Sequence, residues 1–183
     1  MMADSEIRTE EQPAEHPLVA RLRTGVADAV LASHAFRGDA TAIVPRAKLL
    51  EVCRFLRDDA ELRFDMLVDV TAVDYLGRVP RFEVVYHLYS VPLNHRIRIK
   101  VALVESDPNL PSLVPIWVGA NWLERETWDL YGIVFDGHPD LRRIYLYEEF
   151  QGHPLRKDYP KTKRQPLIGP GAASSACAEE SGR

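Results

Sequence analysis

The sequence predicts an α+β fold: a two-layer domain with helices on one face of a mainly antiparallel sheet, followed by a short helix and an extended C-terminal arm. Two observations support this. Three segments between residues 63 and 103 alternate apolar and polar side chains with a period of two, which is typical of strands covered on one side. Two earlier segments repeat apolar residues at helical spacing, and helices on one sheet face make a two-layer domain.

Length and charge favour one neutral domain. The chain has 183 residues, of which 27 are acidic and 23 basic. Residues 1–16 hold five of the acidic side chains and one basic side chain, which leaves 22 of each kind in the rest. Because general nucleic-acid binders carry a strong basic excess, this balance argues against that class.

The two cysteines, Cys53 and Cys177, lie far apart in sequence, which argues against a disulfide scaffold and favours a reducing compartment. An iron–sulfur cluster needs about four cysteine ligands, so we expect none in this chain alone. We find no signal peptide and no apolar run near the ~20 residues that cross a bilayer. Contact with a membrane is therefore expected only through another subunit.

The N-terminal part is predicted to contain a leader, two helices and a short strand. Residues 1–16 are polar and acidic, so we expect a disordered leader. Helical spacing predicts a first amphipathic helix from Pro17 to about His34, and residues 41–44 favour a strand. Pro45 then begins a second helix, on which Cys53 is expected to be buried in the core.

Alternation defines three strands. The first is predicted to place Phe64, Met66, Val68 and Val70 on one apolar face, and the others cover about residues 82–89 and 96–103. Pro92 and Asn94 favour a hairpin between the last two strands. Their polar face carries Glu83, His87, Arg96, Arg98 and Lys100. We interpret this face as solvated, with cover by a partner as the alternative.

After the leader, the chain divides into three predicted segments. Residues 17–120 form the α+β domain and end in a proline-rich linker with one short helical turn. Residues 121–164 form a short helix and a docking arm, and residues 165–183 a disordered tail.

The short helix is predicted from a capping box of Asn121 and Glu124, with Gly132 as its C-terminal stop. The helical wheel places Glu124 among aromatic side chains, where an ionised carboxylate needs a partner. Glu124 either completes the capping box only or also receives a basic side chain from Arg142, Arg143, Arg156 or Lys157. On the opposite side, Arg125 and Asp129 are four residues apart and form a possible pair.

Residues 142–164 combine seven basic with three acidic side chains and place aromatic residues between them. This composition is enriched at protein–protein hot spots, so we interpret the segment as an extended docking arm. His138 and His153 lie near carboxylates, but the chain has no HExxH or CxxC motif that would indicate a metal site. Nucleotide-binding loops and nucleophile motifs are also missing from the sequence.

The segment ERETWDLYGIVFDGHPDLRRIYL, followed by GHPLRKDYP, closely resembles the signature of the C-type subunit family of NADH:quinone oxidoreductase, the respiratory complex I of bacteria and mitochondria. The matching residues are Glu124-Arg125-Glu126, Asp129, Gly132-Ile133, Phe135, Gly137-His138-Pro139, Leu141-Arg142-Arg143 and Pro154-Leu155-Arg156-Lys157-Asp158. The resemblance covers about residues 17–160, since the family has the same order of helices and strands upstream.

This resemblance implies a non-catalytic subunit without cofactors in the hydrophilic arm of a proton-translocating enzyme complex. Flavin, iron–sulfur clusters and quinone would be bound by partner subunits. The implied partners are the D-type subunit, which carries the quinone site, and the B-type and I-type iron–sulfur subunits, with no nucleic acid. The implied location is peripheral, at the cytoplasmic face of the bacterial inner membrane, through the complex.

The residues expected to hold the subunit and its arm on these partners are Glu124, Arg125, Glu126, Asp129, His138, Arg142, Arg143, Arg156, Lys157 and Asp158. We expect charge reversal of Arg142 and Arg143 to release the subunit while leaving its own fold intact. Two alternatives stay open: the equivalent subunit of a related membrane-bound hydrogenase or other-donor complex, and an independent nucleic-acid-binding module.

Overall fold

The structure, a computed structural model, describes residues 15–165. Most of the predicted leader, the tail after Gln165 and Cys177 lie outside the described residues. In chain order the elements are α1 (Pro17–Gly25), β1 (Ala32–Phe36), β2 (Asp39–Ile43), a 3-10 turn η1 (Arg46–Lys48), α2 (Leu49–Asp58), β3 (Met66–Asp74), β4 (Phe82–Ser90), β5 (His95–Leu103), β6 (Asn109–Pro111), α3 (Ala120–Tyr131) and β7 (Val134–Asp136).

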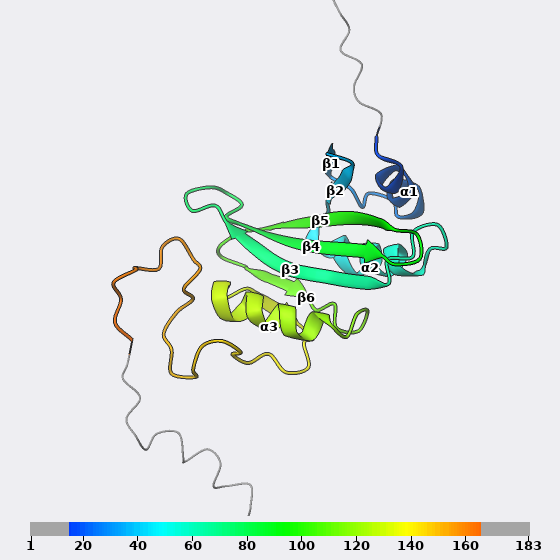
Figure 1. Ribbon diagram of the computed structural model, residues 1–183. Helices are drawn as coiled ribbons and strands as arrows, with labels where there is room; N and C mark the ends of the chain where they lie inside the picture. The colour runs from blue at the N-terminus through cyan, green and yellow to red at the C-terminus, as the bar shows by residue number, and fades with distance from the viewer. Residues whose placement is uncertain (1–14, 166–183) are drawn as a thin grey trace, which may run out of the picture.

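The predicted α+β class is confirmed (Figure 1). Five strands form one sheet in the order β1-β2-β5-β4-β3, in which only the β2–β5 pair is parallel. The predicted hairpin between β4 and β5 is present, since Ser90 pairs with His95. No helix within residues 15–165 is long and apolar enough to cross a membrane.

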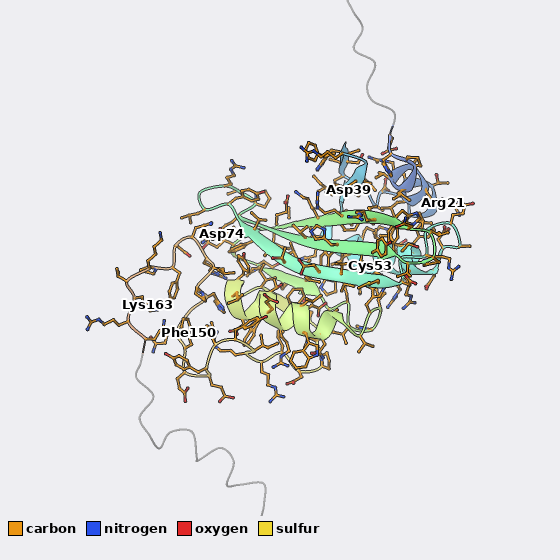
Figure 2. All side chains as sticks on the ribbon, in the orientation of Figure 1. Arg21, Asp39, Cys53, Asp74, Phe150 and Lys163 are labelled. Atoms are coloured by element: carbon orange, nitrogen blue, oxygen red, sulfur yellow. The ribbon has the colours of Figure 1, made fainter. Side chains whose placement is uncertain are left out.

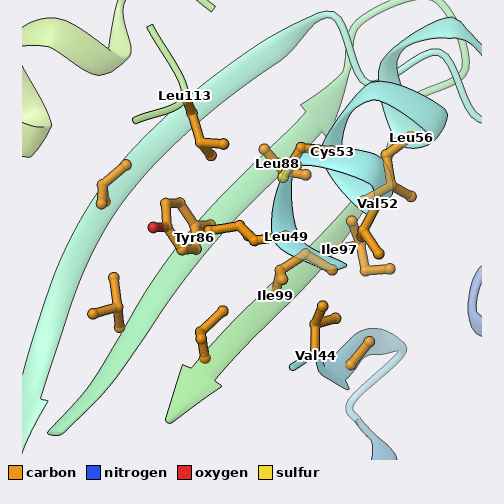
Figure 3. Close-up of a cluster of buried hydrophobic side chains, with 14 of the residues drawn as sticks. Val44, Leu49, Val52, Cys53, Leu56, Tyr86, Leu88, Ile97, Ile99 and Leu113 are labelled. Atoms are coloured by element: carbon orange, nitrogen blue, oxygen red, sulfur yellow. The ribbon is translucent and has the colours of Figure 1, made fainter. Parts of the chain in front are cut away.

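The core lies on one face of this sheet. Figure 3 shows α2 over β4 and β5, with Val52 and Cys53 directed toward Leu88 and Ile97. Cys53 is fully buried, as predicted. Helix α3 lies against β3, where the Thr127 hydroxyl donates a hydrogen bond to the Val70 carbonyl at 3.0 Å.

The prediction of one helix from Pro17 to about His34 is wrong, because the helix ends at Gly25 and residues 32–36 form β1. Gly25 lies against α2 so closely that a Cβ atom there would stand 1.9 Å from the Phe55 ring. Beyond it the chain turns at residues 26–28, where Asp28 has a φ of +55°. Strand β1 then pairs with β2 through a turn at Gly38, whose φ is +88°. Val26, Ala29 and Val30 lie after the helix but are buried, and their spacing imitated that of a helix.

The predicted apolar face of β3 is also wrong. Met66 and Val68 are about half exposed, whereas Leu67 and Val70 are buried. The cause is a β-bulge between Leu67 and Asp69, which leaves Val68 as an extra residue opposite β4. Because one inserted residue reverses the facing of side chains along a strand, the alternation inferred across this point could not hold.

The segment predicted as a linker contributes to the core. Leu110 and Leu113 are fully buried, and the Trp117 indole N–H donates to the Phe64 carbonyl at 3.1 Å. Strand β6 in this segment pairs in parallel with β7, which follows α3. The hydrophobic core is therefore continuous from the sheet into α3.

Candidate functional site

The signature region begins with α3, whose start differs from the prediction. The capping box is wrong: Gly119 is the N-cap residue, no side chain caps the helix, and Asn121 is already helical. The Asn121 carbonyl instead accepts a hydrogen bond from His138 Nε2 at 3.1 Å. The predicted stop is confirmed, since Gly132 ends the helix with a φ of +74°.

The side chain of Glu124, a residue of α3, is fully buried. One carboxylate oxygen accepts from the Ser112 hydroxyl and the other from the Leu113 backbone N–H, both at 2.6 Å. Burial raises the pKa of this carboxyl to about 7, although these two hydrogen bonds act in the opposite direction. The alternative that gave Glu124 a basic partner is wrong, because none of the described Lys or Arg side chains forms an ion pair with it.

We expect Glu124 to make stability fall as pH rises. The native carboxyl keeps its proton up to a pKa of about 7, against 4.5 for an ordinary glutamate. Between these values the native state binds more protons than the unfolded state, so the free energy of unfolding decreases with pH, by at most about 3 kcal/mol. Glu124→Gln is expected to remove this decrease, as measured by urea unfolding across that pH range.

The matched control for that experiment is Glu126→Gln, which changes a more exposed carboxylate on the same helix. It should keep the pH dependence of the wild-type chain. Equal slopes for wild type and Glu124→Gln would contradict the role of Glu124.

Asp129 is the anchor of the arm. It is fully buried, and one oxygen pairs with Arg143 Nη1 at 2.6 Å. The other oxygen accepts three successive backbone N–H groups, from Ile144, Tyr145 and Leu146, at 2.9–3.1 Å. Burial alone would raise the pKa of Asp129, but these hydrogen bonds together outweigh it and lower the pKa. The predicted pair of Arg125 with Asp129 is therefore wrong.

Arg125 and Arg143 hold the arm from two sides. Arg125 is nearly buried and donates to the backbone carbonyls of Arg142 and Arg143 at 3.1 and 3.0 Å, with its guanidinium over the Trp122 ring. Arg143 donates to the Phe150 carbonyl at 2.8 Å. Both arginines thus stabilise the position of the arm within the chain, because each donates hydrogen bonds to backbone carbonyls of the arm.

The arm turns back across the end of α3. His153 Nδ1 donates to the Asp129 carbonyl at 2.9 Å, and Arg156 Nε donates to the Tyr131 carbonyl at 2.6 Å. A Cβ atom at Gly132 would lie 2.6 Å from His153 and 2.9 Å from Arg156. Glycine is therefore required at this helix end both for its φ and for the close approach of the arm.

A second buried cluster, which the sequence analysis missed, fastens the far end of the arm. Arg81, directly before β4, binds both oxygens of Asp74 at 2.8 Å, and it also reaches Glu105 at 2.5 Å and Asp158 at 3.0 Å. Asp74 additionally accepts the Lys157 backbone N–H at 2.8 Å. Figure 2 shows Asp74 at the end of β3 that faces the arm.

A signal for this cluster was present in the sequence. Asp74 continues the series Val70 and Ala72, which are buried at every second position of β3. A carboxylate on the buried side of a strand requires a charged partner, and Arg81 across the hairpin is a candidate close in sequence. The side chains of both residues are at most 3% exposed.

The predicted site residues thus fall into three groups. Glu124, Arg125 and Asp129 are buried, while Glu126, His138, Arg143 and Arg156 are partly buried. Arg142, Lys157 and Asp158 are the more exposed members. Across residues 15–165 we find no cluster of His, Cys, Asp and Glu side chains that could hold a metal ion.

Two aromatic side chains of the region are exposed near the buried charged residues that hold the arm. Trp122 is 62% exposed and Tyr145 is 65% exposed. Together with the exposed Arg142 they form what we call the arm surface. The buried charges fix the backbone from which these three side chains project, because Arg125 stacks on Trp122 and holds the Arg142 carbonyl, and Asp129 holds the Tyr145 N–H.

The fold and this region define an α+β protein whose charge-rich C-terminal arm is fastened to its own core and presents aromatic residues outward. Residues 42–165 match the family described as "Respiratory-chain NADH dehydrogenase, 30 Kd subunit". The chain belongs to this family, and the resemblance seen in the sequence is confirmed.

Curated relatives carry a consistent name. The chain is 54% identical over 143 residues to the C subunit of NADH-quinone oxidoreductase from Roseiflexus castenholzii, and the match covers 78% of this chain and 82% of the relative. It is 49% identical over 142 residues to the protein of the same name from Geotalea uraniireducens, covering 78% and 85%. These homologues are subunits of an oxidoreductase complex of the respiratory chain.

Solved structures share the fold. A trypsin-resistant fragment of Nqo5 is 35% identical, with a TM-score of 0.60 over 68% of this chain and 98% of the fragment. A chain of an archaeal membrane-bound sulfane sulfur reductase gives a TM-score of 0.68 over 79% and 85%, at 22% identity. The second likeness shows the fold alone.

Proposed function

We propose that this chain is a non-catalytic subunit, without a cofactor of its own, of a proton-translocating NADH:quinone oxidoreductase. It holds the quinone-site subunit and neighbouring iron–sulfur subunits together at the cytoplasmic face of the bacterial inner membrane. Electrons pass from NADH through flavin and clusters to quinone within those partners. Family membership over residues 42–165 supports the assignment to the complex.

The arm surface is the observation that supports a docking role. Trp122, Tyr145 and Arg142 combine two exposed aromatic rings with a guanidinium, the residue types that dominate protein–protein hot spots. Their backbone is already fixed by Asp129 and Arg125. A surface fixed before binding loses little conformational entropy on contact, which favours tight assembly.

Arg143 does not belong in the mutational test, because its pairing with buried Asp129 makes it part of the fold. The test therefore uses Trp122→Ala, Arg142→Glu and Tyr145→Ala together. We expect at least tenfold less of this chain to co-purify with the complex, since truncating central hot-spot residues costs about 2 kcal/mol or more each. NADH:quinone reductase activity should fall in proportion.

The control is Arg54→Glu, an exposed charge reversal on α2, an element that contributes nothing to the arm surface. The triple variant loses the stacking of Arg125 on Trp122, so its stability should fall by no more than about 1 kcal/mol. Thermal unfolding of the purified full chain measures this fall and separates lost docking from lost folding. Full co-purification and activity of the triple variant would overturn the docking proposal.

A further inference from the structure

A groove of about 620 Å³ runs along the sheet face opposite the core. We call it the outer groove. Its floor and walls include Met66, Val68 and Asp69 of β3, His87 of β4, Arg98 of β5 and Asp39 of β2. Asp39, labelled in Figure 2, lies at the β1–β2 hairpin beside β5. This face carries the basic side chains for which the sequence left solvent or a partner as alternatives.

The β-bulge determines which side chains of β3 line the groove. It places Val68 and Asp69 next to each other opposite His87, so that an apolar and an acidic side chain share one wall. Met66 and Val68 are 47% and 49% exposed. Two adjacent half-exposed aliphatic side chains on a sheet face mark a surface that loses water favourably when covered.

The central charges of the groove are left without ionic partners. Asp69, His87 and Arg98 form a row across three neighbouring strands, with Asp69 at one end and Arg98 at the other. Within residues 15–165, the Arg98 side chain donates only to the Thr41 hydroxyl at 3.3 Å, and the Asp69 side chain makes neither a hydrogen bond nor an ion pair. Burial, followed by the Arg98 charge, lowers the pKa of His87, so the imidazole between them is neutral at pH 7.

The backbone of the groove floor limits what can bind there. β4 and β5 are each paired on both sides, so their peptide groups are already used in the sheet. An extended peptide lying on this floor would find no backbone hydrogen-bond partners, whereas a helix satisfies its own backbone. Asp69 and Arg98 stand two strand spacings apart, about 10 Å, which matches the ~10–12 Å diameter of a helix.

We propose that the outer groove binds an amphipathic helix of a partner subunit, with its apolar stripe on Met66 and Val68, a carboxylate facing Arg98 and a basic side chain facing Asp69. This inference rests on the proposed function and adds a second docking surface, on the opposite side of the sheet from the arm surface. A subunit with two such surfaces bridges two neighbours.

The test places a photo-cross-linking amino acid at Val68 of the full-length chain, assembled in membranes with its complex. We expect one cross-linked peptide, from a helical segment of a single partner, with a Glu or Asp in its centre. A second site, Val104, provides the control, because it has similar exposure (42%) and lies outside the groove. It should not capture that peptide.

Charge exchange then tests the recognition. Arg98→Glu should reduce the Val68 cross-link at least tenfold, Arg98→Lys should retain most of it, and Arg98→Glu combined with reversal of the acidic residue in the captured peptide should restore it. A cross-link to residues 1–14 of the same chain, to lipid alone, or one that Arg98→Glu leaves unchanged overturns the inference.

The two proposals fail in different ways. If the wild-type chain does not co-purify with an oxidoreductase complex, the proposed function fails. If the chain assembles normally and Val68 captures no partner helix, only the outer-groove inference fails.

Discussion

Replacing Asp129 by Asn should destabilise the chain by about 3 kcal/mol and release the arm, because removing one member of a buried ion pair leaves the other uncompensated. Arg143 would lose its carboxylate, and the N–H groups of Ile144, Tyr145 and Leu146 would share a single neutral acceptor. Urea unfolding measures the loss of stability. Hydrogen exchange of these three amides is expected to accelerate more than that of the sheet.

Asp140→Asn is the matched control. Its carboxylate pairs with Arg142 at 2.9 Å at the surface, where such a pair contributes at most about 1 kcal/mol. Unchanged exchange at residues 144–146 in Asp129→Asn would contradict the anchoring role of this carboxylate.

Arg81→Met should destabilise the chain by about 4 kcal/mol. The substitution keeps an apolar side chain but removes the guanidinium that lies over the Phe82 ring. It leaves Asp74 buried without its cation and Glu105 and Asp158 without the positive charge between them. Thermal and urea unfolding give the magnitude. The end of the arm near Lys157 should also become accessible to protease, since Asp74 binds its backbone N–H.

A double variant separates the buried charge from the packing. Adding Asp74→Leu to Arg81→Met removes the uncompensated carboxylate and should recover part of the lost stability. Arg78→Met, which alters an exposed guanidinium on the same hairpin, should change stability by less than about 0.5 kcal/mol. A double variant less stable than Arg81→Met would contradict the role assigned to the Asp74 charge.

Several parts of the fold follow from local pattern alone. The alternation survives along β5 and most of β4 because both strands are regular, with Val85 as a residue buried on the outer side of β4. Gly132 ends α3 as predicted, since a left-handed φ at that point suits glycine. Cys53 lies on the apolar side of α2 and is buried with it.

Other parts depend on contacts that no local pattern shows. Helix α1 stops where Gly25 packs against Phe55, a residue of the following helix. The bulge at Val68 reverses which side chains of β3 face the core, and the composition of the strand does not indicate a bulge at this position. Both features are set by tertiary packing, which overrides local periodicity.

The charged residues of the signature segment also show what a sequence pattern leaves undetermined. Their density indicated a docking segment, but the sequence does not reveal which of them lie inside. Asp129, Arg125 and Arg143 are used to fasten the chain to itself, and only side chains such as Arg142 remain outside for a partner. The docking role of the exposed members is a proposal that the arm-surface variants test.

The order of residues around Asp129 also matters while the chain is being made. Every described partner of its carboxylate follows it in sequence, between Arg143 and Leu146, and His153 arrives later still. A ribosome therefore delivers α3 before the residues that neutralise and cover it. All strands of the five-stranded sheet have been synthesised once β5 has emerged, whereas the residues that cover the outer side of α3 come last. A chain interrupted shortly after Gly132 therefore leaves the Asp129 carboxylate without the arm residues that bury it in the finished protein.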